Sequence, residues 1–160
     1  MRRTAESRES GFTLIELLVT MTLFGVILAI AVAPYKNYQS AQAHQNTTRI
    51  VVASLRNAQV SAVAESATYR VTFGADGKSW QAARLQGATW KNVGPVVRTG
   101  DDKVTVQNAA FLQEDGSLAS TVYFYPRGTA TKGSLAVGRT GRSKVYTVTV
   151  EGLTARVSYS

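Results

Sequence analysis

The chain has 160 residues, enough for one globular domain with an appended segment and too few for a large multidomain enzyme. It contains no Cys, which excludes a disulfide framework, a thiolate metal site and a thiol nucleophile, and the lone His44 excludes a multi-His metal cage within one chain. The 18 Lys and Arg residues outnumber the 10 Asp and Glu residues. The resulting net charge of +8 makes anionic partners plausible, whether nucleic acid or lipid head groups.

A long apolar segment occupies residues 12–33, with Glu16 as its single charged residue and no Pro. As a helix it would be about 33 Å long, enough to cross the hydrocarbon core of a bilayer. Three Arg residues precede it, which favours a cytoplasmic N-terminus and an extracytoplasmic remainder. A cleaved secretory signal has a shorter apolar core, and Pro34 restricts the bond that would be cut. The pattern therefore predicts a retained membrane helix over residues 12–34.

Glu16 requires an explanation within this apolar segment. An ionisable side chain at the centre of a membrane helix costs about 2.5 to 3.5 kcal/mol for the residue types measured, and it commonly marks a function or a partner. Glu16 lies near one end of the segment, so the alternative explanation is that its side chain extends out of the apolar region to the membrane–water interface.

The stretch Gly11-Phe12-Thr13-Leu14-Ile15-Glu16, after a short basic leader, resembles the processing and assembly signal of type IV pilins and of type II secretion pseudopilins. This resemblance implies that a prepilin peptidase cuts after Gly11 and removes the leader, residues 1–11. Phe12 would then be the mature, N-methylated N-terminus, and Glu16 would meet the N-terminal amine of a neighbouring subunit. Such pairing in an apolar helix bundle would offset the desolvation of both charges. The implied partners are the peptidase, other pilin or pseudopilin subunits and an inner-membrane assembly platform.

An amphipathic continuation of the helix is predicted over about residues 35–66, which contain neither Gly nor Pro. Four apolar residues recur at helical spacing and define one face expected to pack on a sheet: Val51, Leu55, Ala58 and Ala62. Arg49, Arg56 and Gln59 are expected to point elsewhere. His44 lies in the polar stretch AQAHQN and is expected to be a solvated surface residue.

Residues 67–160 change to short alternating segments separated by turn residues, the pattern of antiparallel strands. The predicted strands cover residues 68–73, 79–85, 104–107, 111–113, 121–125, 134–137, 145–150 and 156–159. Turns are expected at Asp76-Gly77, Asp115-Gly116, Arg127-Gly128 and Thr140-Gly141. The irregular stretch Gly87–Asp102 is expected to be a surface loop. The predicted fold class is therefore α+β: a long N-terminal helix, membrane-spanning in its first half, packs on antiparallel sheets, and residues 35–160 form an extracytoplasmic globular domain. The resemblance to type IV pilins implies that this fold is pilin-like.

A second resemblance concerns the helix end and the strands. SLRNAQVSAVAESATYRVTF, then Trp80, then AFLQEDGSLASTVYFYPRGTATKGSLAV is similar to the GspH/FimT branch of minor pilins and pseudopilins. That branch has an Ala-rich helix end, an Asp-Gly turn and an apolar strand ending in Pro-x-Gly. The similarity implies a subunit that assembles through its N-terminal helix into a type IV pilus or a type II secretion pseudopilus. It would be a single-pass protein of the cell membrane before it enters the filament.

Catalysis has little support in the sequence. The adjacent pairs Asp101-Asp102 and Glu114-Asp115 lie in polar stretches, where solvation or turn capping is the ordinary role of a carboxylate. Neither a P-loop nor a G-x-G-x-x-G motif occurs. No catalytic residue, metal site or cofactor is expected, and an anchored extracytoplasmic enzyme is one of two rival functions, the other being a DNA receptor at a pilus tip.

Basic residues gather late in the chain. Five of them follow one another without an intervening acid, and a sixth lies near the end: Arg127, Lys132, Arg139, Arg142, Lys144 and Arg156. Such clustering suits phosphate contacts. Some members of the similar FimT branch bind DNA through a C-terminal Gly-Arg-x-Arg motif, for which two stretches could stand in. Gly141-Arg142-Ser143-Lys144 keeps the spacing but has the turn residues of a hairpin, whereas Ala155-Arg156-Val157-Ser158 lies in the tail but lacks the Gly and the second Arg. DNA binding for DNA uptake is therefore an alternative function, and a solvated basic loop is the other explanation.

Overall fold

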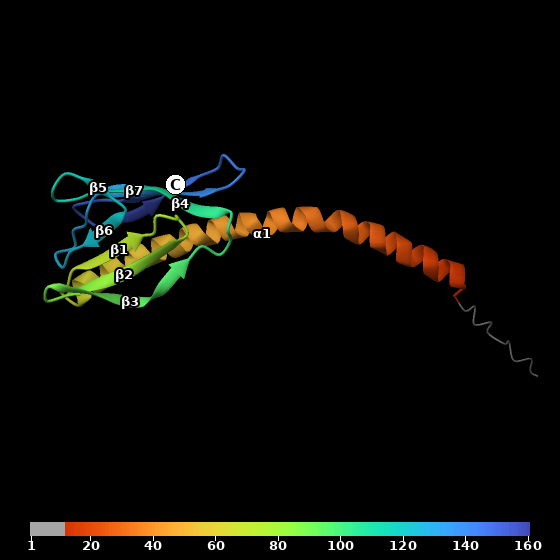
Figure 1. Ribbon diagram of the computed structural model, residues 1–160, viewed down its shortest axis with the longest axis horizontal. Helices are drawn as coiled ribbons and strands as arrows, with labels where there is room; N and C mark the ends of the chain where they lie inside the picture. Colours follow the sequence, from red (N-terminus) through yellow and green to blue (C-terminus); the bar gives the residue numbers. More distant parts are fainter. Residues whose placement is uncertain (1–11) are drawn as a thin grey trace, which may run out of the picture. The chain divides into compact units, whose positions relative to one another are not determined.

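The computed structural model describes residues 12–160, except for the side chains of residues 31–37 and of Ser40. Within this range one helix precedes nine strands (Figure 1). The elements are α1 (Leu14–Ala64), β1 (Tyr69–Phe73), β2 (Ser79–Gln86), β3 (Thr89–Arg98), β4 (Val104–Leu112), β5 (Leu118–Ala119), β6 (Thr121–Phe124), β7 (Gly133–Arg139), β8 (Tyr146–Val150) and β9 (Val157–Tyr159). The predicted α+β class is confirmed.

The chain divides into two compact units, Met1–Tyr38 and Gln39–Ser160. As far as the structure describes it, the first unit is the N-terminal part of α1. The second unit contains the remainder of α1 and all the strands. The leader, residues 1–11, lies outside the described residues.

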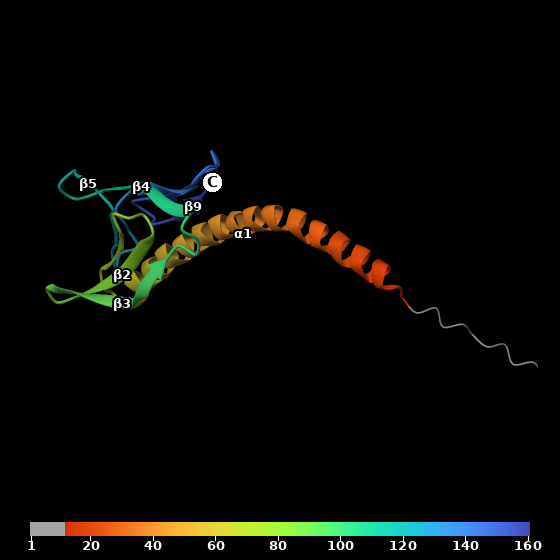
Figure 2. The same ribbon diagram turned by 45° about the vertical axis from the view of Figure 1, so that its right-hand side comes forward.

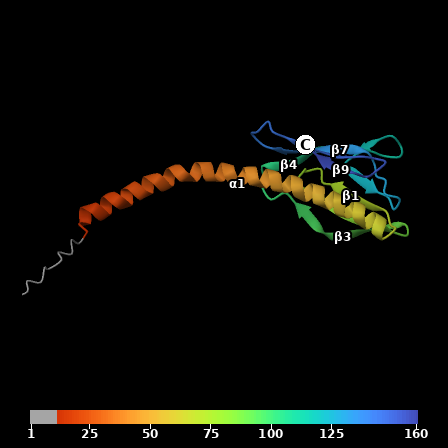
Figure 3. The same ribbon diagram turned by 180° about the vertical axis from the view of Figure 1, so that it is seen from behind.

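Two antiparallel sheets make up the strand region, with the orders β3-β2-β1-β6 and β5-β4-β7-β8-β9. Figure 2 labels β2 and β3 of the first sheet and β4, β5 and β9 of the second. In the first sheet Val71 of β1 lies opposite Ala82 of β2 on one side and Val122 of β6 on the other. In the second sheet Leu135 of β7 lies opposite Val148 of β8. Seen from behind, the C-terminal part of α1 lies across the strands (Figure 3).

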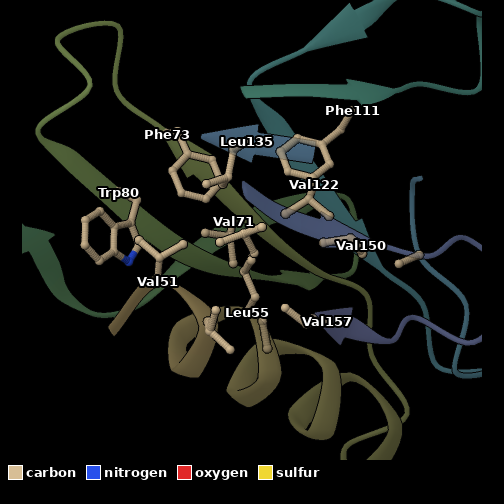
Figure 4. Packing of buried hydrophobic residues seen from close by; sticks show 14 of the residues in the cluster. Val51, Leu55, Val71, Phe73, Trp80, Phe111, Val122, Leu135, Val150 and Val157 are labelled. Atoms are coloured by element: carbon tan, nitrogen blue, oxygen red, sulfur yellow. The ribbon is translucent and has the colours of Figure 1, made fainter. Parts of the chain in front are cut away.

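The hydrophobic core joins this part of α1 to both sheets. The predicted helix face is confirmed, because Val51, Leu55, Ala58 and Ala62 are all buried. They belong to one cluster with residues of the first sheet, such as Val71 and Trp80, and of the second sheet, such as Phe111 and Val150 (Figure 4). The indole Nε1 of Trp80 also donates a hydrogen bond to Ser54 Oγ on α1, at 3.0 Å. Since burying a large apolar side chain contributes about 1.5 to 3 kcal/mol, this cluster fixes the helix to the strands.

The expectation of a surface loop over Gly87–Asp102 is wrong, because this stretch contains the ten-residue strand β3. β3 is an edge strand with mostly exposed residues, so it lacks the alternation that marks a half-buried strand. It also contains Gly94 and Pro95, which lie where the pairing with β2 shifts register. Pro is tolerated on an edge strand, since one side of such a strand has no partner.

The two short strands predicted over residues 104–107 and 111–113 are one strand, β4, and the two-residue strand β5 was not predicted. The register of β4 against β7 shifts between Gln107 and Ala110, and Asn108 has a φ of 51°. A bulge of this kind inserts extra residues without ending the strand. The polar Asn108 therefore interrupts the sequence pattern but not the pairing.

Candidate assembly site and basic surface

The start of α1 is capped by a residue that the sequence analysis did not single out. Thr13 directly precedes the helix, and its Oγ1 accepts a hydrogen bond from the backbone N of Glu16 at 3.3 Å. Its carbonyl O accepts from the backbone N of Leu17 at 3.2 Å. A Thr followed three residues later by Glu is the spacing of a capping box, so the pattern before the apolar run could have identified this cap.

This cap places Glu16 in the first turn of the helix, where its side chain is exposed. A carboxylate there is favoured by the positive end of the helix dipole. Among the described residues, Glu16 has no ion-pair partner. Phe12, four positions earlier, is 78% exposed, whereas Gly11 lies outside the described residues. The site thus presents an exposed carboxylate four positions after the residue that cleavage would make N-terminal.

Apolar side chains surround the described N-terminal part of α1 on every side. The following residues are between 47% and 85% exposed, and we term them the apolar N-terminal surface: Phe12, Leu14, Ile15, Leu17, Leu18, Val19, Met21, Leu23, Phe24, Val26, Ile27, Leu28 and Ile30. Nearly consecutive positions on a helix point in all directions around its axis. A helix that is apolar all round must be covered by other apolar groups.

Within the part of the chain that the structure describes, no helix combines the length and the hydropathy needed to cross a membrane. The expected membrane-spanning character of residues 12–34 is therefore not shown by the structure.

The late basic residues do not form one surface. Strand β7 separates Lys132, which directly precedes it, from Arg139, which ends it. At about 3.3 Å per residue, the seven steps from Lys132 to Arg139 place these two positions about 23 Å apart along the strand. Arg142 and Lys144 follow Arg139 in the connection to β8, so they belong to the same end of the sheet.

The remaining two basic residues lie near the start of β7. Arg127 is in the connection between β6 and β7. Arg156 directly precedes Val157, which pairs with Val150, and Val150 pairs with Gly133. The six candidates therefore form two groups: Arg127, Lys132 and Arg156 at one end of β7, and Arg139, Arg142 and Lys144 at the other.

The Gly141–Lys144 stretch is a hairpin connection, as its turn residues predicted. Gly141 has a φ of 77°, and the backbone N of Arg142 donates to the carbonyl O of Arg139 at 3.1 Å. Arg142 is exposed, and Nζ of Lys144 lies 5.0 Å from the ring centroid of Tyr146. The loop thus presents its charges to solvent on a tight turn.

The expectation that His44 is a solvated surface residue is wrong. Its side chain is 6% exposed, and its ring centroid lies 4.8 Å from that of Tyr146. Its Nε2 lies 2.8 Å from the carbonyl O of Val137 on β7. The polar neighbours of His44 in the sequence obscured this role. However, Thr47, Thr48 and Val51 are also buried and follow His44 at helical spacing, which extends the buried face by two turns.

The acids of the pair Asp101-Asp102 form a turn hydrogen bond and an ion pair. Oδ1 of Asp101 accepts from the backbone N of Lys103, and Oδ1 of Asp102 lies 3.2 Å from Nζ of Lys78. Among residues 12–160, no group of three His, Cys, Asp or Glu side chains is arranged to hold a metal ion. The two acids of the second pair, Glu114 and Asp115, lie beside a pocket described below.

The helix and its two antiparallel sheets have the fold of minor pilins and minor pseudopilins. The type IV minor pilin FimU of Pseudomonas aeruginosa superposes with a TM-score of 0.60 at 14% identity, covering 77% of this chain and 92% of that chain. The minor pseudopilin EpsH from the type II secretion system of Vibrio cholerae gives a TM-score of 0.58 at 11% identity, covering 72% of this chain and 94% of that chain. No curated protein sequence matches the chain.

Family models identify the chain more closely. Residues 7–32 match the prokaryotic N-terminal methylation motif, and residues 46–154 match the type II transport protein GspH. The chain therefore belongs to the GspH family. It is a minor pilin or pseudopilin of a type IV pilus or a type II secretion system, which implies other pilin subunits as partners and processing by a prepilin peptidase.

Proposed function

We propose that this chain is a structural subunit without catalytic activity, held in the cell membrane by residues 12–34 before it assembles. Its leader, residues 1–11, would lie in the cytoplasm, and residues 35–160 would form the extracytoplasmic domain. The prepilin peptidase would cut after Gly11 and leave an N-methylated Phe12. An inner-membrane platform would then pass the subunit into the filament.

The observation that carries this proposal is the apolar N-terminal surface, which nothing in the chain's own fold covers within the described residues. Lipid and the helices of neighbouring subunits are both apolar enough to cover it. Transfer from one to the other would cost little, since both surroundings exclude water.

Glu16 supplies the polar contact of this assembly. Its carboxylate lies in the first helical turn and has no ion-pair partner among the described residues. The N-terminal amine of a neighbouring subunit carries the opposite charge, and pairing the two in an apolar bundle would offset a desolvation cost that each charge would otherwise bear alone.

Substitution of Glu16 tests this proposal. Glu16→Ala should insert into the membrane as well as the native chain, because loss of a charge eases insertion. Its incorporation into filaments should be largely abolished, since breaking a buried ion pair costs about 3 to 5 kcal/mol. Quantitative immunoblotting of membrane and sheared filament fractions measures both, with Glu151→Ala as the matched control in an exposed loop. Normal incorporation of Glu16→Ala would remove the proposed role.

Processing is tested separately by intact-mass measurement of the purified protein. The expected mature chain begins at Phe12 and carries one added methyl group. Gly11→Ala should retain the leader, because the peptidase needs close access to the backbone at the cut. A native chain that begins at Met1 or at Pro34 would contradict the processing scheme.

A further inference from the structure

An open pocket of about 450 Å³ lies on the β3-β2-β1-β6 sheet, on the face turned away from the core. On β1, Arg70 alternates with the buried Tyr69 and Val71, so it points to the opposite face. Tyr123 lies directly across from Arg70 on β6 and shares that outer face. The residues of the pocket that carry the argument are Leu85, Trp90, Tyr123, Tyr125, Glu114 and Asp115.

Half-buried aromatic rings form the body of this pocket. The ring centroids of Trp90 and Tyr123 are 5.7 Å apart in a tilted arrangement. Cζ of Arg70 lies 4.3 Å from the Trp90 ring centroid, so a guanidinium already stacks on this aromatic group within the chain. The electron-rich faces of Trp and Tyr attract cations, and the sheet holds these rings side by side.

Two carboxylates border the pocket. Oε1 of Glu114 accepts a hydrogen bond from the Tyr125 hydroxyl at 3.1 Å. Oδ1 of Asp115 accepts from Oγ of Ser117 at 2.6 Å and from its backbone N at 2.9 Å, and these hydrogen bonds hold the pKa of Asp115 below its usual range. Burial, together with the hydrogen bond to Glu114, raises the pKa of Tyr125 above its usual range. Neither carboxylate has an ion-pair partner among residues 12–160.

We propose that this pocket binds the Lys or Arg side chain of a protein partner, with the cation against Trp90, Tyr123 and Tyr125 and beside Glu114 and Asp115. The occupant follows from charge complementarity. The pocket is lined by two carboxylates without an ion-pair partner among the described residues and by no Lys or Arg, while Arg70 stacks on Trp90 without lining the pocket. A neutral ligand could contact the aromatic rings, but the carboxylates would contribute little to its binding free energy. The inference goes beyond filament assembly, since it concerns the face of the sheet opposite α1.

The test uses the full-length chain in a non-ionic detergent. The probe is N-acetyl-arginine amide, and its matched neutral control is N-acetyl-citrulline amide, which has nearly the same shape. The chain has two Trp residues, and their indole N–H resonances report binding. Trp90 lines the pocket, whereas Trp80 is 2% exposed in the core and serves as an internal reference. The arginine probe should shift the Trp90 resonance saturably and bind about threefold to tenfold more tightly than the citrulline probe.

Substitutions then locate the charge effect. Glu114→Gln keeps an acceptor for the Tyr125 hydroxyl but removes the charge, so it should weaken arginine binding about threefold and leave citrulline binding unchanged. Glu151→Gln is the control, because Glu151 is an exposed carboxylate that does not line the pocket. Equal affinity for the two probes, or an unchanged affinity in Glu114→Gln, would overturn the proposal. A stronger response of Trp90 to N-acetylglucosamine than to the arginine probe would also overturn it and would indicate a sugar site. These measurements need no filament, so their failure would leave the proposed assembly function untouched.

Discussion

Nε2 of His44 on α1 lies 2.8 Å from the carbonyl O of Val137 on β7, and both residues are buried. A carbonyl oxygen can only accept, so Nε2 carries the hydrogen and donates it. The partners are 93 positions apart in the sequence, and this bond therefore fastens the helix to the second sheet independently of the apolar cluster.

Substitution of His44 should destabilise the domain. His44→Leu keeps a side chain of moderate size but removes the donor, so we expect the free energy of unfolding to fall by about 1 to 3 kcal/mol. Urea titration of the full-length chain in detergent, followed by Trp fluorescence, measures the change. Gln45→Leu, at the exposed neighbouring position, is the control. Equal stability of the two variants would show that the hydrogen bond contributes nothing.

Two turn glycines provide a matched pair for a second prediction. Gly77 and Gly116 both have positive φ, at 64° and 82°. A Cβ on Gly77 would collide with the carbonyl O of Val106, whereas a Cβ on Gly116 meets nothing within 4 Å. Gly116→Ala should cost about 1 kcal/mol for the backbone conformation alone. Gly77→Ala should cost about 1 to 3 kcal/mol more, because β4 must also shift. Thermal denaturation measures the loss of stability in each variant. Equal losses in the two variants would mean that β4 shifts at this contact without a cost in stability.

Acid should weaken the domain through Asp76 and Asp115. Hydrogen bonds lower the pKa of both carboxyls, chiefly from the backbone N of Lys78 to Asp76 and from the Ser117 hydroxyl to Asp115. A carboxyl whose pKa is lower in the folded state stabilises fully above its unfolded value, about 3.9, and loses that contribution as the pH falls through the folded value. Stability measured between pH 6 and pH 2 should therefore decline less in an Asp76→Asn, Asp115→Asn double variant. An identical decline would assign the acid sensitivity to other groups.

The division of the basic residues predicts diffuse rather than localised attraction to DNA. Arg142→Ala with Lys144→Ala, and Arg127→Ala with Lys132→Ala, remove equal charge from opposite ends of β7. Each pair should weaken binding of a labelled duplex equally and reduce the salt dependence by about one to two phosphate contacts. Anisotropy titrations over a salt series measure this. A loss confined to the Arg142 and Lys144 variant would instead indicate a DNA site at the hairpin.

The sequence predicted those parts of the fold in which burial follows a simple period. The face of Val51 and Leu55 repeats at helical spacing, and β1 alternates between buried and more exposed residues, so both were found. β3 was missed because an exposed edge strand carries no such alternation, and Gly94 and Pro95 mimic a loop. The role of His44 was missed for a related reason, since its partner is a backbone atom, which has no signature in the sequence.

For the candidate functional residues, too, the sequence predicted only what is local along the chain. The Glu16 motif is local, so the sequence located it, and the structure added the cap at Thr13. The basic residues were grouped by their order along the chain, but a strand carries Lys132 and Arg139 to opposite ends of the sheet. The aromatic pocket draws Trp90, Glu114 and Tyr123 from separate segments. The strand order β3-β2-β1-β6 places Trp90 and Tyr123 in one sheet, and Glu114 joins them from the connection between β4 and β5 of the other sheet.

The edges of the two sheets bear on how such subunits can meet. β5 and β9 have two and three residues, and β3 is interrupted by Pro95. Along the edge strand β6, the backbone N and O of Tyr123 are both taken up by Thr131. Short, broken or occupied edges resist the addition of a strand from another chain. The edges of this domain therefore disfavour a sheet that continues from one subunit into the next, so contacts between subunits would be made by side chains and helices rather than by shared strands.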